Sequence, residues 1–577
     1  MEHVVEHAEG MIIERDVAIK MDDGVLLRAD VFRPLHVGRY PVLMTYGPYA
    51  KGLHFADGYP AQWEMLTRGH PEVLRNTSGR HANWETADPE RWVPEGYVVI
   101  RVDSRGTGQS PGYVDPFSPR ETRDYHDCIE WAGVQPWSTG KIGLLGVSYY
   151  AMNQWQVAAT RPPHLAAICP FEGASDYYRD AVRHGGMMCT FWARWYPKQV
   201  ETVQYGLGAN GPVSRATGKP IAGDITLDAA NLVANRTDIE RDQLSHEFID
   251  DWFRERMPDL SRIEVPLLSC GNWGGQGLHL RGNVEGYLQA GSTQKWLEMH
   301  GLEHWTEFYT DYGFRLQLQF FDHVLKGRKN GWEDQPAVQL QLRTPNGFLT
   351  RHTRGWPLPE TCWTEFYLDS LALALSEKMA VVSGSVEYDQ MAEEVIFRTM
   401  PFEREMEITG PLCATIFAST TAKEIDLFVT LRLFDPTGNE VLFTGAVEPN
   451  APVTQGWLRA SHRDLDPSRS LPWRPWYKHE AATPVIQGEI YELAVELWPT
   501  SIIVPTGYIL ALTIGGQDFD HGRKGEMPKI YGVEQRGSSV YLHDHPEDRI
   551  SENLTGEVKI YTGGDCRSRL LLPQIPG

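Results

Sequence analysis

Short apolar runs alternate with amphipathic stretches from about residue 12 to residue 335, and the alternation then stops. Each run is followed by Gly, Pro or polar residues; the runs are 40–46 (YPVLMTY), 97–102 (YVVIRV), 142–145 (IGLL), 165–171 (LAAICPF) and 265–270 (VPLLSC). Parallel strands are covered by helices on both faces and are therefore apolar along their whole length. The pattern predicts an α/β fold with a mainly parallel sheet.

After residue 336, β-rich segments bounded by turns replace this pattern. They are residues 338–343, 405–419, 425–434 (followed by the turn DPTG at 435–438), 490–495, 508–514 and 558–561. Many short strands with regular turn signals and few helix signals are typical of an all-β sandwich or jelly roll. We predict a jelly-roll domain over residues 336–577.

Between residues 176 and 262 the strand signals fade, and aromatic and Arg-rich helical stretches occur at 191–200 (FWARWYPKQV) and 244–256. An insertion between two strands of a sheet usually lies over the strand ends and shapes a pocket there. A chain of 577 residues is also too long for one hydrophobic core. We therefore expect a first core part (1–175), a helical cap (176–262) and a second core part (263–335) before the β domain.

Charge and cysteine usage exclude several classes of protein. The 54 Lys and Arg against 76 Asp and Glu give a net charge of −22, which repels nucleic acids and anionic membranes. The amino-terminal MEHVVEHAEG lacks the features of a signal peptide, so we expect a cytoplasmic location. The 7 cysteines are scattered and form no CxxC pair, which argues against a disulfide framework and a zinc site.

The sharpest local motif is residues 141–155 (KIGLLGVSYYAMNQW), in which an apolar strand meets Gly146-Val147-Ser148 and a stretch able to form a helix. This is the context of a nucleophile elbow, where a tight turn lifts a serine oxygen above the sheet. The match is partial, because Tyr150 replaces the second glycine of GxSxG, and an ordinary turn is the alternative. Ser148 is the candidate nucleophile.

A serine nucleophile needs an imidazole within hydrogen-bond reach, and the chain has 20 histidines. In α/β-hydrolases the histidine comes last in chain order, in a loop beyond the final strands. His304 fits this position, because it lies in a turn after the short apolar segment 295–300, and His300 is its rival. The spacing of these two histidines suits a metal only on a helix, and Gly301 argues against one.

Several motifs occur in an order that resembles the CocE/NonD hydrolases, the family of cocaine esterases and X-prolyl dipeptidyl-peptidases. In the first half they are residues 21–34 (MDDGVLLRADVFRP), 46–51 (YGPYAK), 102–110 (VDSRGTGQS), 146–149 (GVSY) and 320–327 (FFDHVLKG). In the second half, 407–411 (EITGP) and 426–433 (DLFVTLRL) look like the carboxy-terminal jelly roll of that family. The resemblance covers nearly the whole chain and implies an α/β-hydrolase domain with a helical cap, followed by the jelly roll.

The resemblance implies catalytic roles for individual residues of this chain. Ser148 matches the nucleophile and His304 the base. Tyr49 matches the tyrosine whose hydroxyl forms the oxyanion hole with the backbone N–H of Tyr149. A phenol can donate one hydrogen bond to developing negative charge without carrying a charge itself. A packing aromatic is the alternative for Tyr49.

The sequence departs from the family at the third member of the triad. Relatives carry an aspartate in a turn after the strand equivalent to 265–270, but here residues 271–279 read GNWGGQGLH and contain no carboxylate. Neighbouring strands lie about 4.8 Å apart, so an acid at the end of segment 165–171 could reach the same histidine. We favour Glu172, with Asp176 second and Glu303 a poor third; a solvated acid or a salt bridge is the alternative for Glu172.

Other side chains could line a substrate pocket. Asn272, Trp273, Gln276 and His279 lie in the glycine-rich segment, and Trp192 lies in the expected cap. Packing in a core is an equally good interpretation of these residues.

The sequence thus predicts a serine hydrolase that cleaves small-molecule esters or amides and needs no metal or organic cofactor. One alternative is an X-prolyl dipeptidyl-peptidase, for which Glu201, Asp250 and Asp251 could supply a carboxylate for the substrate ammonium. Another is a non-catalytic binding protein with a vestigial elbow, which the missing aspartate suggests. The resemblance is also compatible with a homo-oligomer, and the sequence leaves the oligomeric state open.

Overall fold

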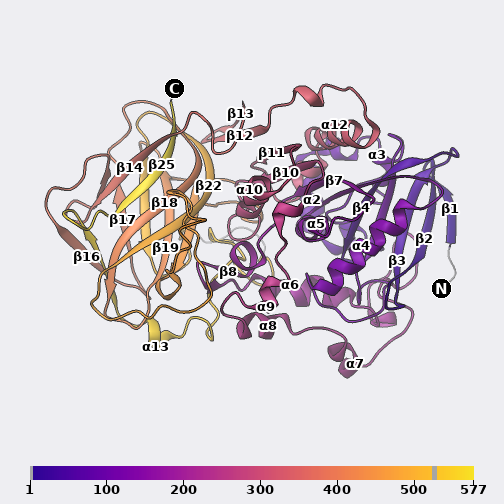
Figure 1. Ribbon diagram of the computed structural model, residues 1–577, viewed down its shortest axis with the longest axis horizontal. Helices are drawn as coiled ribbons and strands as arrows, with labels where there is room; N and C mark the ends of the chain where they lie inside the picture. Colours follow the sequence, from indigo (N-terminus) through magenta and orange to yellow (C-terminus); the bar gives the residue numbers. More distant parts are fainter. Residues whose placement is uncertain (1–3, 523–528, 577) are drawn as a thin grey trace.

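A computed structural model of the chain describes residues 4–522 and 529–576 (Figure 1). The earlier part of the chain, in indigo to magenta, lies on the right of the view and carries both strands and helices. The carboxy-terminal strands, in orange and yellow, form the left part.

The first part is built on a sheet whose order is β1-β2-β3-β5-β4-β6-β7-β10-β11-β12-β13. Its strands are β1 (Val4–Ala8), β2 (Met11–Lys20), β3 (Leu26–Pro34), β4 (Tyr40–Gly47), β5 (Val98–Asp103), β6 (Ser138–Val147), β7 (Leu165–Phe171), β10 (Leu267–Asn272), β11 (Lys295–His300), β12 (Val338–Thr344) and β13 (Gly347–Thr353). All pairings from β5 to β12 are parallel, as the apolar runs predict.

Both faces of the parallel part of this sheet are covered by helices, which explains why β4, β5, β6, β7 and β10 are mostly buried. On β4, Val42 and Met44 pack into a core that includes residues of α4 and α5, whereas Leu43 faces the core beneath α12. The helices are α1 (Phe55–Gly58), α2 (Pro60–Gly69), α3 (Pro89–Trp92), α4 (Pro119–Gly133), α5 (Tyr149–Ala159), α6 (Phe191–Gln199), α7 (Ala229–Ala234), α8 (Ile239–Ser245), α9 (Asp251–Arg254), α10 (Leu280–Gln289), α11 (Thr306–Tyr309), α12 (Asp311–Lys326) and α13 (Ser551–Leu554).

The segment between β7 and β10 holds α6 to α9 and the short hairpin of β8 (Arg183–His184) and β9 (Met187–Met188). The helix predicted at 191–200 is present as α6. The stretch 244–256 is not one helix, because α8 ends at Ser245 and α9 spans only Asp251–Arg254.

The strands of the carboxy-terminal part pair with one another in antiparallel fashion, except that β15 and β17 are parallel. They are β14 (Cys362–Asp369), β15 (Ala374–Ser376), β16 (Gly384–Asp389), β17 (Glu394–Arg398), β18 (Met406–Thr420), β19 (Asp426–Phe434), β20 (Glu440–Val441), β21 (Thr454–Arg459), β22 (Tyr491–Val504), β23 (Ile509–Gly515), β24 (Glu557–Thr562) and β25 (Arg569–Ile575). They enclose a separate apolar core. The predicted strand at 338–343 is β12, which continues the first sheet by pairing with β11. One of the carboxy-terminal strands, β22, also pairs in parallel with β12 of the first part.

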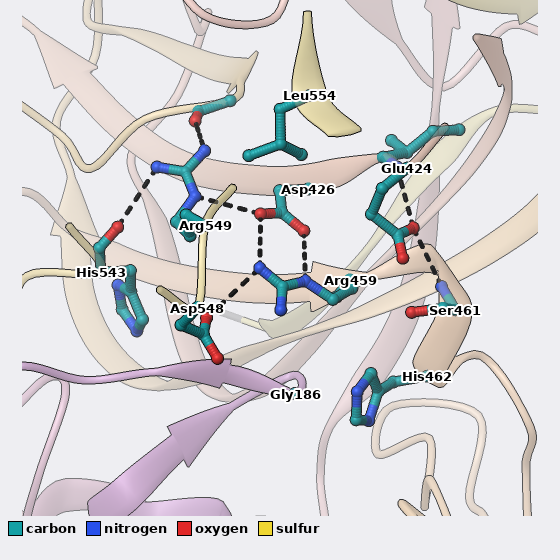
Figure 2. A network of polar contacts seen from close by, with 12 residues as sticks. Gly186, Glu424, Asp426, Arg459, Ser461, His462, His543, Asp548, Arg549 and Leu554 are labelled. Atoms are coloured by element: carbon teal, nitrogen blue, oxygen red, sulfur yellow. Dashed lines mark hydrogen bonds and ion pairs between the residues drawn. The ribbon is translucent and has the colours of Figure 1, made fainter. Parts of the chain in front are cut away.

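A buried ionic network joins this part to the β7–β10 insertion (Figure 2). Asp426 receives two hydrogen bonds from Arg459, at 2.8 and 3.0 Å, and a third from Arg549 at 3.0 Å. Asp548 contacts Arg459 at 3.3 Å and accepts from Arg183 of β8 at 2.5 Å. Charged side chains far apart in the sequence therefore fix the insertion against the carboxy-terminal strands.

Candidate active site

Ser148 lies between β6 and α5 in a conformation that few non-glycine residues adopt. Its φ is +61° and its ψ is −116°. The surrounding backbone holds it there, because its N–H donates to Phe171 O at 3.0 Å and that of Val147 donates to Glu85 O at 3.1 Å. Backbone strain of this kind persists only where the structure around it is rigid, and it is common at active sites. The turn has the form of the predicted nucleophile elbow.

The two predicted oxyanion-hole residues, Tyr49 and Tyr149, pack against each other beside the elbow. Tyr149 is the first residue of α5, so its N–H has no carbonyl one turn earlier to accept it. The Tyr149 hydroxyl is bonded separately, because it donates to Glu121 at 2.6 Å. The ring of Tyr49 packs edge-on against Tyr149, with centroids 6.0 Å apart. Burial raises the pKa of Tyr49, so its phenol stays a neutral donor.

Glu172 and His304 meet as an acid–histidine pair. Glu172 directly follows β7 and is fully buried, and its Oε2 lies 2.7 Å from Nδ1 of His304. Although burial opposes ionisation, His304 and His300 hold the pKa of Glu172 at about 2. Burial also disfavours the imidazolium, yet Glu172 and Glu85 raise the pKa of His304 to about 10. The carboxylate can thus fix the ring and stabilise its charge.

Asn272 is the last residue of β10, just before the turn in which the family resemblance would place an aspartate, and it supports Glu172. Its amide donates to Glu172 Oε1 at 3.1 Å and to Leu302 O at 2.5 Å, and its oxygen accepts from Gly274 N at 2.8 Å. His300 approaches the same Glu172 oxygen at 3.2 Å. The polar groups of Asn272 are thus engaged within the protein, although we predicted that they line the substrate pocket.

The rival acids and the rival histidine are engaged elsewhere. Asp176 accepts from the N–H groups of Tyr178 and Arg179 and pairs with the Arg179 guanidinium at 2.7 Å. Glu303 accepts from the Thr306 hydroxyl at 2.9 Å. His300 lies in β11, and its other nitrogen contacts Glu298 at 2.8 Å. Of the three acids considered from the sequence, Glu172 is therefore the one that contacts His304.

The sequence analysis missed Glu85, which contacts the other nitrogen of His304. Glu85 Oε1 lies 2.8 Å from Nε2 of that ring, and burial raises the pKa of Glu85 to about 7. Glu85 lies in the connection between β4 and β5 and has a φ of +61°. Nothing in its local sequence, HANWETAD, marks it as a site residue.

The imidazole of His279 contacts the Ser148 hydroxyl. Its Nε2 lies 3.4 Å from Oγ of Ser148, a long and weak contact. Its ring stacks on His304 with centroids 5.0 Å apart and planes 14° apart. Burial and the charge of His304 hold the pKa of His279 well below its ordinary value, so the ring is neutral. We expected His279 only as a possible pocket residue.

The remaining predicted pocket residues lie in packed surroundings. Trp273 is fully buried in a separate cluster, where its indole N–H donates to Gln341 O at 2.7 Å, and it offers no surface to a ligand. Gln276 donates to Pro452 O at 3.2 Å. Trp192 donates to Ala181 O at 2.8 Å and belongs to the aromatic core that also contains Tyr49 and Tyr149. The packing interpretation fits Trp273 because its only polar atom is already bonded.

The carboxy-terminal part supports the turns that carry these groups. His304 N–H donates to Ala446 O at 2.8 Å, and Ala446 N–H donates to Gly274 O at 3.0 Å. A Cβ on Gly274 would lie 2.4 Å from Gly445, so the two backbones can approach this closely only because position 274 is a glycine. The loop before β21 therefore helps to fix the position of His304.

Within residues 4–522 and 529–576, no cluster of three or more His, Cys, Asp or Glu side chains has a geometry that could hold a metal ion. In the same ranges no helix is both long and apolar enough to span a bilayer.

Comparisons with known proteins match both parts of the chain. Residues 23–306 match the family model of the X-Pro dipeptidyl-peptidase (S15 family). Residues 330–571 match that of the X-Pro dipeptidyl-peptidase C-terminal non-catalytic domain. The chain therefore has an amino-terminal catalytic domain and a mostly β, non-catalytic carboxy-terminal domain.

Individual relatives extend over nearly the whole chain. The cocaine esterase of Rhodococcus sp. (strain MB1 Bresler) is 23% identical over 644 residues, which cover 98% of each chain. The Xaa-Pro dipeptidyl-peptidase of Lacticaseibacillus casei (strain BL23) is 22% identical and covers 90% of this chain and 74% of its own. The crystal structure of a CocE/NonD family hydrolase from Staphylococcus aureus is 32% identical, covers 100% of this chain and 96% of its own, and gives a TM-score of 0.84. The chain belongs to the CocE/NonD family and is a serine hydrolase.

Proposed function

We propose that this serine hydrolase cleaves small-molecule carboxylic esters through an acyl-enzyme formed on Ser148. The observation that carries the proposal is the 2.7 Å contact of His304 with Glu172, beside a serine on a strained elbow. Glu172 stands in for the missing aspartate, because the register pairs Val147 of β6 with Phe171 of β7. Ser148 and Glu172 thus follow adjacent strand ends.

In the proposed reaction His304 Nε2 takes the proton of Ser148 while Oγ bonds to the ester carbonyl. The carbonyl oxygen becomes an oxyanion that accepts hydrogen bonds from the Tyr149 N–H and the Tyr49 hydroxyl. The imidazolium then protonates the leaving alkoxide as the carbon–oxygen bond breaks. Water repeats the sequence on the acyl-enzyme, releases the acid and restores Ser148.

A direct test compares hydrolysis of a short-chain p-nitrophenyl ester and of Gly-Pro-p-nitroanilide by the wild type and Ser148→Ala. Ester turnover that is lost in the variant supports the proposal, and anilide turnover would favour an X-prolyl dipeptidyl-peptidase. Equal rates of the two proteins on the ester would contradict the nucleophile assignment. The three acids that we considered for binding a peptide ammonium are already paired, Glu201 with Arg236, Asp250 with His246 and Asp251 with Arg254.

We further propose that the carboxy-terminal domain is a jelly roll and that residues 176–262 form a cap over the site. The separate apolar core and the antiparallel pairings support the first proposal. The shared aromatic core of Trp192, Tyr49 and Tyr149 supports the second. A cytoplasmic location and a homo-oligomer remain predictions.

A further inference from the structure

The nitrogen of His304 that must serve Ser148 is already occupied by a carboxylate. Nε2 lies 2.8 Å from Oε1 of Glu85, while Nδ1 is bonded to Glu172. An imidazolium carries one proton on each nitrogen, so both protons of His304 point at carboxylates in this state. The ring cannot accept the proton of Ser148 until the contact of Nε2 with Glu85 is broken.

The Ser148 hydroxyl contacts a different histidine, His279. Its hydroxyl lies 3.4 Å from Nε2 of His279, whose ring stacks on that of His304. His279 Nδ1 is buried and makes no hydrogen bond within the described ranges. A charged His279 would therefore have a buried, unsatisfied N–H, which makes this ring a poor base. The contact with His279 places Ser148 but does not replace the base.

The backbone of Glu85 is tied to the elbow itself. Its carbonyl accepts the N–H of Val147, and a Cβ on Gly146 would lie 3.3 Å from that oxygen. The side chain is 2% exposed, and its Oε2 is buried without a hydrogen bond within the described ranges. A carboxylate that used both oxygens would be fixed as a structural group, whereas Glu85 is attached mainly through His304.

The titratable groups facing Glu85 come from several elements. Apart from His304 and Glu172, they are hydroxyls that burial keeps neutral, namely those of Tyr49, Tyr59, Tyr150, Tyr309, Tyr531 and Tyr541. Removing the charge of Glu85 therefore acts chiefly on His304.

We propose that Glu85 is a positioning residue that competes with Ser148 for Nε2 of His304 and holds the triad open in the free enzyme. The inference rests on the proposed role of Ser148 and His304. When the contact breaks, the Nε2 proton leaves on Glu85 as its carboxylic acid, and the neutral ring can then accept the proton of Ser148. Substrate that displaces Glu85 closes the triad.

The decisive variant is Glu85→Gln, which keeps the shape of the side chain and removes its charge. An anion at this distance raises the pKa of a neighbouring base by about 1 to 3 units, so the acidic limb of kcat/KM moves to lower pH by at least about one unit. At neutral pH the kcat/KM for p-nitrophenyl acetate rises by up to about tenfold for each unit of that shift, while the plateau kcat stays within about threefold. An unmoved limb, or a loss above about 100-fold at every pH, would overturn the proposal.

Glu303→Gln is the matched control, because it removes one negative charge beside His304 in the sequence without touching the ring. It should leave the acidic limb unmoved; a shift equal to that of Glu85→Gln would make the effect one of net charge and overturn the proposal. If Glu85→Gln does not fold, Glu85→Asp keeps the charge but shortens the side chain. It should move the limb in the same direction by a smaller amount, and an unmoved limb would again contradict the proposal.

A readout that needs no turnover separates this inference from the proposed function. In Ser148→Ala the downfield imidazole N–H resonances of His304 report its protonation. Adding Glu85→Gln should lower the pH at which the Nε2 proton is lost by at least about one unit. An unchanged midpoint would overturn the role of Glu85 even if Ser148 is the nucleophile. A shifted midpoint with an active Ser148→Ala variant would remove the proposed mechanism and leave the Glu85 contact established.

Discussion

Two buried charge networks in this molecule differ in what their charges can do. Around Asp426, two guanidinium groups from Arg459 and Arg549 bond the same carboxylate (Figure 2). Around His304, imidazole lies between the carboxylates Glu172 and Glu85. Arginine is always charged, whereas histidine and a buried carboxylate exchange protons near neutral pH.

The difference separates a structural network from a reactive one. Although burial opposes ionisation, Arg459 and Arg549 hold the pKa of Asp426 below its ordinary value. Near His304 the same burial raises the pKa of Glu85 to about 7, and two carboxylates raise that of the ring to about 10. Burial alone therefore does not make a charged group reactive; a partner that can exchange a proton with it does.

The largest effect is expected from Glu172→Gln, which breaks the reactive network. The ring of His304 would lose its orienting carboxylate, and kcat should fall by up to about 10⁴-fold on a p-nitrophenyl ester. Asp176→Asn serves as the control, since Asp176 contacts Arg179 and not the ring, and its kcat should change by less than about threefold. Equal losses in the two variants would remove Glu172 from the triad.

Arg459→Met breaks the structural network and should reduce stability rather than turnover. It leaves Asp426 and Asp548 buried with fewer cations, and removing one partner of a buried pair costs about 3–5 kcal/mol. Urea denaturation measures this free energy of unfolding, and kcat of the folded variant should stay within about threefold. Arg254→Met, which removes exposed pairs with Asp251 and Glu480, should cost less than about 1 kcal/mol. A stable Arg459→Met protein would contradict the structural role.

His279→Asn tests which of the two stacked histidines, His279 or His304, acts as the base. His279 is neutral and only places the serine hydroxyl, so we expect a fall in kcat of about tenfold, measured beside His304→Ala. The loss in His304→Ala should exceed about 10³-fold. If His279→Asn lost as much, His279 and not His304 would be the base.

The smallest effect concerns the pH dependence of stability. Because Asp426 has a lowered pKa in the folded state, its ionised form stabilises the fold above its ordinary pKa. The difference in unfolding free energy between the wild type and Asp426→Asn should stay constant from pH 6 to pH 9 and shrink as the pH falls below about 4. A difference that changed between pH 6 and pH 9 would place a titrating group in the structural network.

The positions of Ser148 and Glu172 could be predicted from the sequence because both residues lie at the ends of strands. Ser148 and Glu172 each come directly after an apolar run, and adjacent parallel strands place their carboxyl ends at one edge. The turn that carries His304 could be found in the same way. Glu85 could not, because its connection has no strand or helix pattern, and its φ of +61° is a property of the folded backbone.

By itself the sequence determined the parallel α/β core, the β-rich carboxy-terminal part and the position of the elbow, because hydrophobic periodicity is local and records which faces are buried. Only the tertiary structure decided that Trp273 is packed, that Asn272 supports Glu172, and that Glu85 contacts Nε2 of His304. Those outcomes depend on distances between segments that the chain brings together only when their cores pack. No local pattern encodes such distances.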